Sequence, residues 1–329
     1  MCGNNKITNS FMEHSRDTYL GLDFGGTKLL IGEIDVDGQV LKYKRYETGY
    51  NNQDSALDIM KKSMDDYIRT VGWNGERSPV AMGVGLIGRV DNSSGVWLQI
   101  DPKRTATIHL AKELSSIYGM LCYIDNDVKS ATRAEKLFGY GKDSDDFIFI
   151  NVGTGIAAGC VTNGKLIRGS HFNAGEVGHT HSGLNIGIKC GCGRDNCVEI
   201  IAAGIGFDRC ARFLSPQYKT KLTIPKDEEQ RVDTREIFEL SMQGDELCVQ
   251  LVENATQSIA NLIMNMVRMS DPDTIILGGG ILLNGYIYSR VLKKLNPTTI
   301  RFVKNGVLLT KLNPDFVGLI GAGAVAMNK

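Results

Sequence analysis

The sequence lacks an excess of charge of either sign. Its 37 lysines and arginines balance 37 aspartates and glutamates, and the isoelectric point is near 6.9. A chain without net charge has no global field that would attract nucleic acid or an anionic membrane surface. We therefore expect neither nucleic acid nor a membrane among its partners.

Long apolar runs are also missing. No segment approaches the roughly 18 consecutive apolar residues of a membrane-spanning helix, and the polar residues 1–17 contain no apolar core of signal-peptide length. Eight cysteines without a secretion signal indicate reduced thiols and a metal site, and hence a cytoplasmic location. A Walker-type lysine loop is absent too, which excludes the ordinary P-loop fold.

The 329 residues are too many for one ordinary core and suggest two domains of about 150 residues each. An apolar strand at 18–23 stops at a glycine turn, and so does a second strand at 147–151. Each is followed by another strand and a hairpin turn, at Asp37-Gly38 and Asn163-Gly164. This repeat predicts an α/β protein made by internal duplication around a shared cleft, with the boundary near residues 125–145.

The remaining elements follow from hydrophobic periodicity. Apolar residues repeat at spacings of three and four over 56–71 and 251–269, which predicts two helices with one buried face each. We assign the methionines of the second helix, including Met269, to the core. Further predicted elements are strands at 80–85, 121–124 and 274–277, a helix around 106–118 and a final Gly/Ala-rich helix at 318–327.

Cysteine and histidine gather in one segment, where three of the eight cysteines lie close to several histidines. Thiolate and imidazole groups from His179, Cys190, Cys192 and Cys197 can surround a zinc ion tetrahedrally. Four protein ligands leave no open position, so we predict a structural zinc; an open position would instead indicate a zinc hydrolase. Unpaired buried thiols are the alternative, whereas cysteines one residue apart form disulfides poorly.

Glycine turns after strands are candidates for binding phosphate. In the first, Gly25 and Gly26 leave backbone N–H groups free, Thr27 and Lys28 add donors, and Asp23 could hold magnesium through water. Similar turns occur at Gly153-Thr154-Gly155 and at Gly278-Gly279-Gly280. A purely structural hairpin is the alternative for the first turn.

The stretch Gly83–Gly88 matches the dinucleotide fingerprint G-x-G-x-x-G and follows a predicted strand. Residues 89–96 are typical of a turn, however, and not of the helix whose N-terminus would hold a pyrophosphate. We therefore predict no dinucleotide site there.

Carboxylates suited to sugar chemistry follow another strand. Asn126 can cap the helix that begins there, and Asp127 in its first turn would be kept ionised by the helix dipole. An ionised carboxylate at a cleft can accept the proton of a sugar hydroxyl. Glu176, His179 and Glu199 flank the cysteines and could bind vicinal hydroxyls, although solvated loop charges are the alternative.

With these residues the chain resembles the ROK family of sugar kinases and sugar-responsive regulators from about residue 18 to 329. The most specific part is Glu176-x-Gly178-His179 followed by Cys190-x-Cys192, Cys197 and Glu199. The resemblance implies a duplicated actin/hexokinase-like (ribonuclease H-like) fold. Its N-terminal domain would span 18–127 and its C-terminal domain 128–329, with the zinc loop inserted at 179–199 and the final helix able to pack back on the first domain.

The resemblance also implies roles for individual residues. Asp127 would be the catalytic base, and Mg²⁺–ATP would lie across the three glycine turns. The implied sugar-binding residues are Gly88, Arg89, Asn126, Glu176, His179 and Glu199. His179 would also bind zinc with the three cysteines.

The expected activity is ATP-dependent phosphorylation of a hexose, first of glucose at its 6-hydroxyl, with N-acetylmannosamine and fructose as alternatives. A sugar-binding sensor without catalysis is the alternative from another class. Family repressors carry an N-terminal winged helix, which the short polar extension here does not resemble, so DNA binding is not expected. Related kinases are often dimers, and a homodimer is expected. Residues 98–102 depart from the family's usual sugar-contacting stretch.

Overall fold

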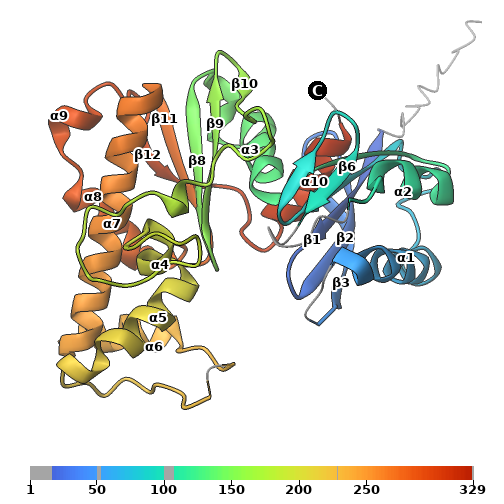
Figure 1. Ribbon diagram of the computed structural model, residues 1–329. Coiled ribbons are helices and arrows are strands. Elements are labelled where there is room, and N and C mark those ends of the chain that lie inside the picture. Colours follow the sequence, from blue (N-terminus) through green and yellow to red (C-terminus); the bar gives the residue numbers. More distant parts are fainter. Residues whose placement is uncertain (1–16, 50–52, 100–106, 228, 328–329) are drawn as a thin grey trace, which may run out of the picture.

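The computed structural model describes residues 17–49, 53–99, 107–227 and 229–327. Two α/β lobes lie side by side, each built on one five-stranded mixed sheet (Figure 1). The N-terminal extension, apart from Asp17, and residues 100–102 of the departing stretch lie outside the described residues. No described helix has the length and apolarity needed to cross a membrane.

The two sheets have the same strand order. In the first lobe it is β3-β2-β1-β4-β7, and in the second β10-β9-β8-β11-β12. In both sheets the first three strands in sequence pair antiparallel and the last two add parallel to the central strand. The strands are β1 (Thr18–Phe24), β2 (Lys28–Asp35), β3 (Val40–Glu47), β4 (Ala81–Leu86), β7 (Leu121–Asn126), β8 (Phe147–Val152), β9 (Ile156–Thr162), β10 (Lys165–Leu166), β11 (Thr274–Gly278) and β12 (Gly306–Leu309). The duplicated topology predicted from the sequence is therefore present.

Helices cover the sheets and extend the second lobe. They are α1 (Gln53–Thr70), α2 (Leu110–Tyr118), α3 (Asp127–Phe138), α4 (Val198–Ala202), α5 (Gly204–Leu214), α6 (Thr234–Met242), α7 (Glu246–Ser270), α8 (Tyr286–Lys294), α9 (Pro297–Ile300) and α10 (Val317–Ala326). Short 3₁₀ turns are η1 (Tyr140–Asp143), η2 (Val177–His179) and η3 (Ser215–Gln217). In Figure 1 the long α7 runs along the second lobe, with α4 to α6 beside its lower half.

Local chemistry explains where the principal helices begin. The Asn126 side chain accepts hydrogen bonds from the N–H groups of Val128 and Lys129, which caps α3. Asp245 caps α7 in the same way through Cys248 N–H, at 3.1 Å. The apolar face of α7 is buried up to Met266, as its periodicity predicts. Met269, also expected in the core, is 68% exposed because it lies in the last turn, beyond the lobe's packing surface.

The last helix of the chain packs on the first lobe. In Figure 1 the red α10 lies on the same side of the molecule as the blue β1, apart from most of the C-terminal half. It contacts β1 and β4. Contact is so close that a Cβ atom on Gly83 would lie 1.9 Å from the Ala322 carbonyl oxygen. Helix α3 packs against α10 and also against β9, so these two helices fill the space between the sheets.

The glycine-rich segment after β4 forms no helix. Instead β5 (Arg89–Asp91) and β6 (Val96–Gln99) pair as a short antiparallel hairpin, and Trp97 is buried beneath it. The helix of a dinucleotide site is absent from 89–99, as predicted, but residues 89–96, predicted as a turn, include the strand β5 and the start of β6. Strands of three and four residues carry too little alternation to be recognised from sequence.

Candidate active site

The two lobes enclose a cleft made of two adjoining chambers. The first, of about 790 Å³, is lined by the β1–β2 turn and Asn126–Asp127 of one lobe and by Thr154, Glu176 and Glu199 of the other. The second, of about 1130 Å³, is lined by Lys28, the β8–β9 turn, the start of α6 and Gly280. Thr154 and Arg231 line both chambers, so the two chambers adjoin at these residues.

Asp127 lies at the wall of the first chamber, at the start of α3. Asn126 before it caps the helix and donates its side-chain N–H to the Gly88 carbonyl, at 3.0 Å. The side chain that caps α3 thus also contacts Gly88, one of the residues predicted to bind sugar. Because the capped helix fixes the backbone here, the Asp127 carboxylate is presented to the chamber by a rigid element.

The electrostatics of Asp127 differ from the expectation. Desolvation raises the pKa of its carboxyl from 3.8 to about 6, the Val128 N–H group opposes this, and the charge of Glu176 adds to it. The helix start does favour the ionised form, as predicted, but burial in the cleft outweighs it. A pKa near neutrality suits a general base, because the group is mostly ionised at pH 7 and still accepts a proton readily.

Asp23 stands beside Asp127 without lining either chamber. Desolvation raises the pKa of its carboxyl to about 7, and the Asp127 charge raises it further. The close approach of Gly318 at the start of α10 explains the desolvation, since a Cβ atom there would lie 2.1 Å from Asp23 Oδ2. Asp23 is therefore a carboxyl group whose charge is easily altered by what binds in the cleft.

Glu176 and Glu199 reach the first chamber from the second lobe. Glu176 lies just before η2, at the end of the loop that follows β10. Glu199 lies on α4, and its Oε2 accepts a hydrogen bond from Ile156 N–H at 2.9 Å. One oxygen of Glu199 thus supports the start of β9. The other is free of this contact and is available to a ligand in the chamber.

Each of the two glycine turns is closed by an internal backbone hydrogen bond. Gly25 N–H donates to the Lys28 carbonyl at 2.9 Å, and Gly153 N–H donates to the Gly155 carbonyl at 3.0 Å. Gly25, Gly26, Thr27 and Gly155 line the first chamber, Lys28 and Gly153 the second. The sequence therefore located both turns, and the structure brings them together across the cleft.

The three glycines of the run 278–280 have two different structural roles. Gly280 lines the second chamber, but Gly278 ends β11 beneath the Phe149 ring. Gly279, at φ +95°, packs its Cα against the Val152 backbone. Only Gly280 faces the cleft. The other two let the chain turn sharply over the neighbouring strand.

Arg89 and His179 lie off the chambers. Arg89 donates from Nη2 to Gln99 Oε1 at 2.8 Å, across the β5–β6 hairpin, and the residues lining the chamber at this point are Ile87 and Gly88. The His179 ring turns to the cysteines instead, with Nδ1 3.6 Å from Cys190 Sγ. Neither side chain lines the first chamber; each contacts residues that lie behind its lining.

Four side chains form a candidate metal centre behind Glu176 and Glu199. One ligand atom from each of His179, Cys190, Cys192 and Cys197 lies within 4.8 Å of all the others, and the sulfurs of Cys192 and Cys197 are 3.6 Å apart. Desolvation, with the neighbouring thiols adding, raises the pKa of Cys197 to about 12. Only a cation at the centre would favour three thiolates so close together, so the donor set fits a metal ion.

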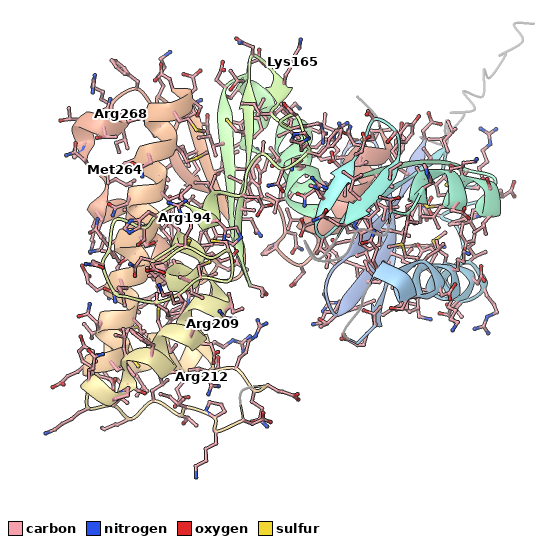
Figure 2. All side chains as sticks on the ribbon, viewed as in Figure 1. Lys165, Arg194, Arg209, Arg212, Met264 and Arg268 are labelled. Atoms are coloured by element: carbon pink, nitrogen blue, oxygen red, sulfur yellow. The ribbon has the colours of Figure 1, made fainter. Side chains whose placement is uncertain are left out.

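Arg231 and Glu229 are cleft residues that the sequence did not reveal. Both lie in the segment between α5 and α6 and line the first chamber. Arg212 of α5, labelled in Figure 2 near the base of the second lobe, donates to the carbonyls of Pro225 and Gln230, both at 2.7 Å. This support places the segment over the cleft. No local motif marks it, because its position depends on carbonyl contacts 13 and 18 residues away.

Comparison with known proteins agrees with this arrangement. The sequence profile of the ROK family matches residues 19–329. The chain is 26% identical over 314 residues to a glucokinase of Thermotoga maritima, covering 93% of this chain and 96% of that protein. It is 31% identical over 274 residues to an N-acetylmannosamine kinase of Shigella flexneri, covering 82% and 86%.

Among solved structures, the fold is similar to a ROK family glucokinase from Streptomyces griseus in complex with glucose and AMPPNP. The TM-score is 0.73 at 25% identity, and the alignment covers 95% of this chain and 100% of that one. The family match extends over both lobes, the two glycine turns and the cysteine-rich segment. The chain belongs to the ROK family.

Proposed function

We propose that the protein is an ATP-dependent sugar kinase that transfers the γ-phosphate to a hexose hydroxyl. One observation carries the proposal: a carboxyl group tuned to a pKa of about 6 faces a chamber shared by two lobes, each of which contributes a glycine turn. The relatives named glucokinase and N-acetylmannosamine kinase support it.

In this proposal the hexose occupies the first chamber. Asp127 accepts the proton of the attacking hydroxyl, and Asn126, Glu176 and Glu199 bind neighbouring hydroxyls. Phosphoryl transfer depends mainly on positioning and charge neutralisation, so a single base and several fixed acceptors suffice for the protein's part. Closure of the lobes would remove water from the reacting groups.

ATP would lie in the second chamber, with its phosphates directed toward the first. The N–H groups of the two turns, Lys28 and Arg231 are the donors near the junction of the chambers. Mg²⁺ bound with ATP supplies further neutralisation of the transferred phosphate. Asp23 is the residue that would hold it through water, because its carboxyl group lies beside the base and a cation there would favour its ionised form.

The metal centre is proposed to hold structural zinc. Zinc–sulfur bonds of about 2.3 Å in a tetrahedron place ligand sulfurs about 3.8 Å apart, close to the 3.6 Å observed between Cys192 and Cys197. Four protein ligands complete the coordination, which favours a structural ion over a hydrolytic one. The ion would fix the loop that joins Glu176 to Glu199.

A coupled assay of ADP release tests the function. Purified protein, ATP and Mg²⁺ are incubated with glucose, N-acetylmannosamine or fructose, and we expect turnover first with glucose. Product position is read by NMR, with phosphate on the 6-hydroxyl expected. Tight hexose binding by calorimetry without turnover on any sugar would instead favour a sugar sensor.

A further inference from the structure

The loop between β10 and η2, residues 167–176, is fastened to the other lobe by an ion pair. Arg168 of this loop donates from Nη1 and Nη2 to the two oxygens of Asp125, at 2.7 and 2.6 Å. The Asp125 side chain is 1% exposed and lies near the end of β7, in the first lobe. A bidentate ion pair between guanidinium and carboxylate fixes the orientation of the two groups as well as the distance between them.

A second contact joins the loop to α3, the helix that directly follows β7. Lys129 of α3 is buried and donates from Nζ to the Phe172 carbonyl, at 3.5 Å. Phe172 has a φ of +58°, which is costly for a residue with a side chain. The loop therefore holds a strained residue at the point where the first lobe contacts it.

The loop ends at Glu176, the carboxylate that faces Asp127. Its last turn is fixed to β9, where Ala158 N–H donates to the Gly175 carbonyl at 2.8 Å. Asp125 is adjacent to Asn126 and two residues before Asp127. The ion pair thus connects the two sides of the first chamber from behind, while neither Arg168 nor Asp125 lines it.

Asp125 and Lys129 are buried within a set of balanced charges, whereas Glu176, at the edge of the set, is exposed. The charged groups that act on Lys129 are the carboxylates of Asp125, Asp127 and Glu176 and the guanidinium of Arg168. Arg133, also on α3, faces Asp125 and Arg168. Removing one charge from such a set leaves a partner unpaired in a desolvated place, so the arrangement specifies one geometry.

We propose that Arg168 is a positioning residue that, through Asp125, holds the Glu176 loop at a fixed place opposite Asp127 before the sugar arrives. The inference rests on the proposed function for its kinetic consequence but not for its structural one. Loss of the bidentate ion pair lets the Glu176 loop move, while Asp127 and the ATP chamber stay intact.

Arg168→Lys tests the proposal, because lysine keeps the charge and cannot make the paired bonds. The loop amides of Ala174 and Val177 are hydrogen-bonded within the loop, so hydrogen–deuterium exchange of residues 169–177 reports its order in the free protein. We expect exchange about tenfold faster, a hexose kcat/KM lower by about ten- to a hundredfold, and an ATP KM within about twofold of the parent.

Arg69→Lys is the matched control, since Arg69 pairs with Asp66 at 2.7 Å on the surface of α1. It should change neither exchange nor kinetics. If Arg168→Lys folds poorly, Asp125→Asn removes the same paired bond while keeping the shape of the side chain. Unchanged exchange of 169–177 in the folded variant overturns the proposal, as does an equal rise in the KM values of hexose and ATP. A parent protein that phosphorylates no hexose would refute the kinase function, and the exchange result would still decide the role of Arg168.

Discussion

The two lobes have the same sheet and the same glycine turn, yet they supply different chemistry to the cleft. In the first lobe the turn is preceded by Asp23, whose carboxyl group lies beside the base Asp127. In the second, Asn151 stands at the corresponding place two residues before its turn, and Glu199 supports the following strand from α4. The first lobe therefore provides the two carboxyl groups with raised pKa values, and the second provides a carboxylate held in place by a backbone N–H group.

A duplicated backbone can be retained while its side chains diverge. Both turns are closed by an internal N–H to carbonyl bond, and both contribute residues to the lining of the cleft. The second lobe alone carries the cysteine-rich insertion, and in our proposal a metal ion bound there would fix the residues that bear its carboxylates. The experiments that follow disable one lobe's contribution at a time.

Replacing the base should have the largest effect. Asp127→Asn keeps the shape of the side chain but removes the proton acceptor, so we expect kcat to fall by about 10²–10⁴ with hexose affinity nearly unchanged. Turnover is measured by ADP release and affinity by calorimetry. The exposed Asp143→Asn serves as the control. Near-normal turnover of the Asp127 variant would remove the assignment of the base.

Loss of the metal should weaken the second lobe's contribution. Cys192→Ser should release zinc and loosen the segment between Glu176 and Glu199, raising the hexose KM by about ten- to a hundredfold. Metal content is measured by mass spectrometry and KM by the coupled assay. Cys160→Ser, a thiol outside the cluster, is the control. Full zinc content with unchanged kinetics would show that the ligand set is wrong.

Weakening the hydrogen bond that supports the start of β9, next to the second glycine turn, should lower activity less. Glu199→Gln keeps an acceptor for Ile156 N–H but weakens it, because a neutral amide accepts less strongly than a carboxylate. We expect a hexose kcat/KM about three- to tenfold lower, measured beside the exposed Glu113→Gln. A loss as large as that of Asp127→Asn would mean that Glu199 takes part in the chemical step and does not only support β9.

The smallest effect is expected from pH, which should act on the stability and on kcat through the two carboxyl groups of the first lobe. The pKa values of Asp127 and Asp23 are raised from 3.8 to about 6 and about 7, so the folded state binds more protons than the unfolded state between pH 4 and 7. Stability should therefore fall as pH rises through this range, whereas kcat, which needs ionised Asp127, should rise. Thermal melting and kcat are measured from pH 4.5 to 8. Parallel changes of both quantities would contradict these shifts.

Prediction from sequence succeeded where one segment carried its own signal. The strands that end in glycine turns, the capped helix at Asn126 and the final Gly/Ala-rich helix each follow from a few adjacent residues. The short helices α4 to α6 and the β5–β6 hairpin were missed, because elements this short or this irregular are stabilised by their neighbours. Met269 was misplaced for a related reason, since periodicity does not show where a packing surface ends.

The residues of the candidate site likewise fall into those marked by local motifs and those placed only by distant contacts. Asp127, Glu176 and Glu199 could be proposed from local motifs, and the structure gathers them in one chamber. Arg231 lines the same chamber without any motif, since its segment is placed by Arg212. Gly278 and Gly279 look like Gly280 in sequence but face the strand beneath them.

The sequence by itself determined the turn geometry, the helix caps and the grouping of cysteines with histidine, because these depend on residues close together in the chain. Tertiary structure alone decided the ionisation of Asp127 and Asp23, the ion pair between Arg168 and Asp125, and the return of α10 to the first lobe. The physical reason is that desolvation and paired charges arise only when distant segments exclude water from one another.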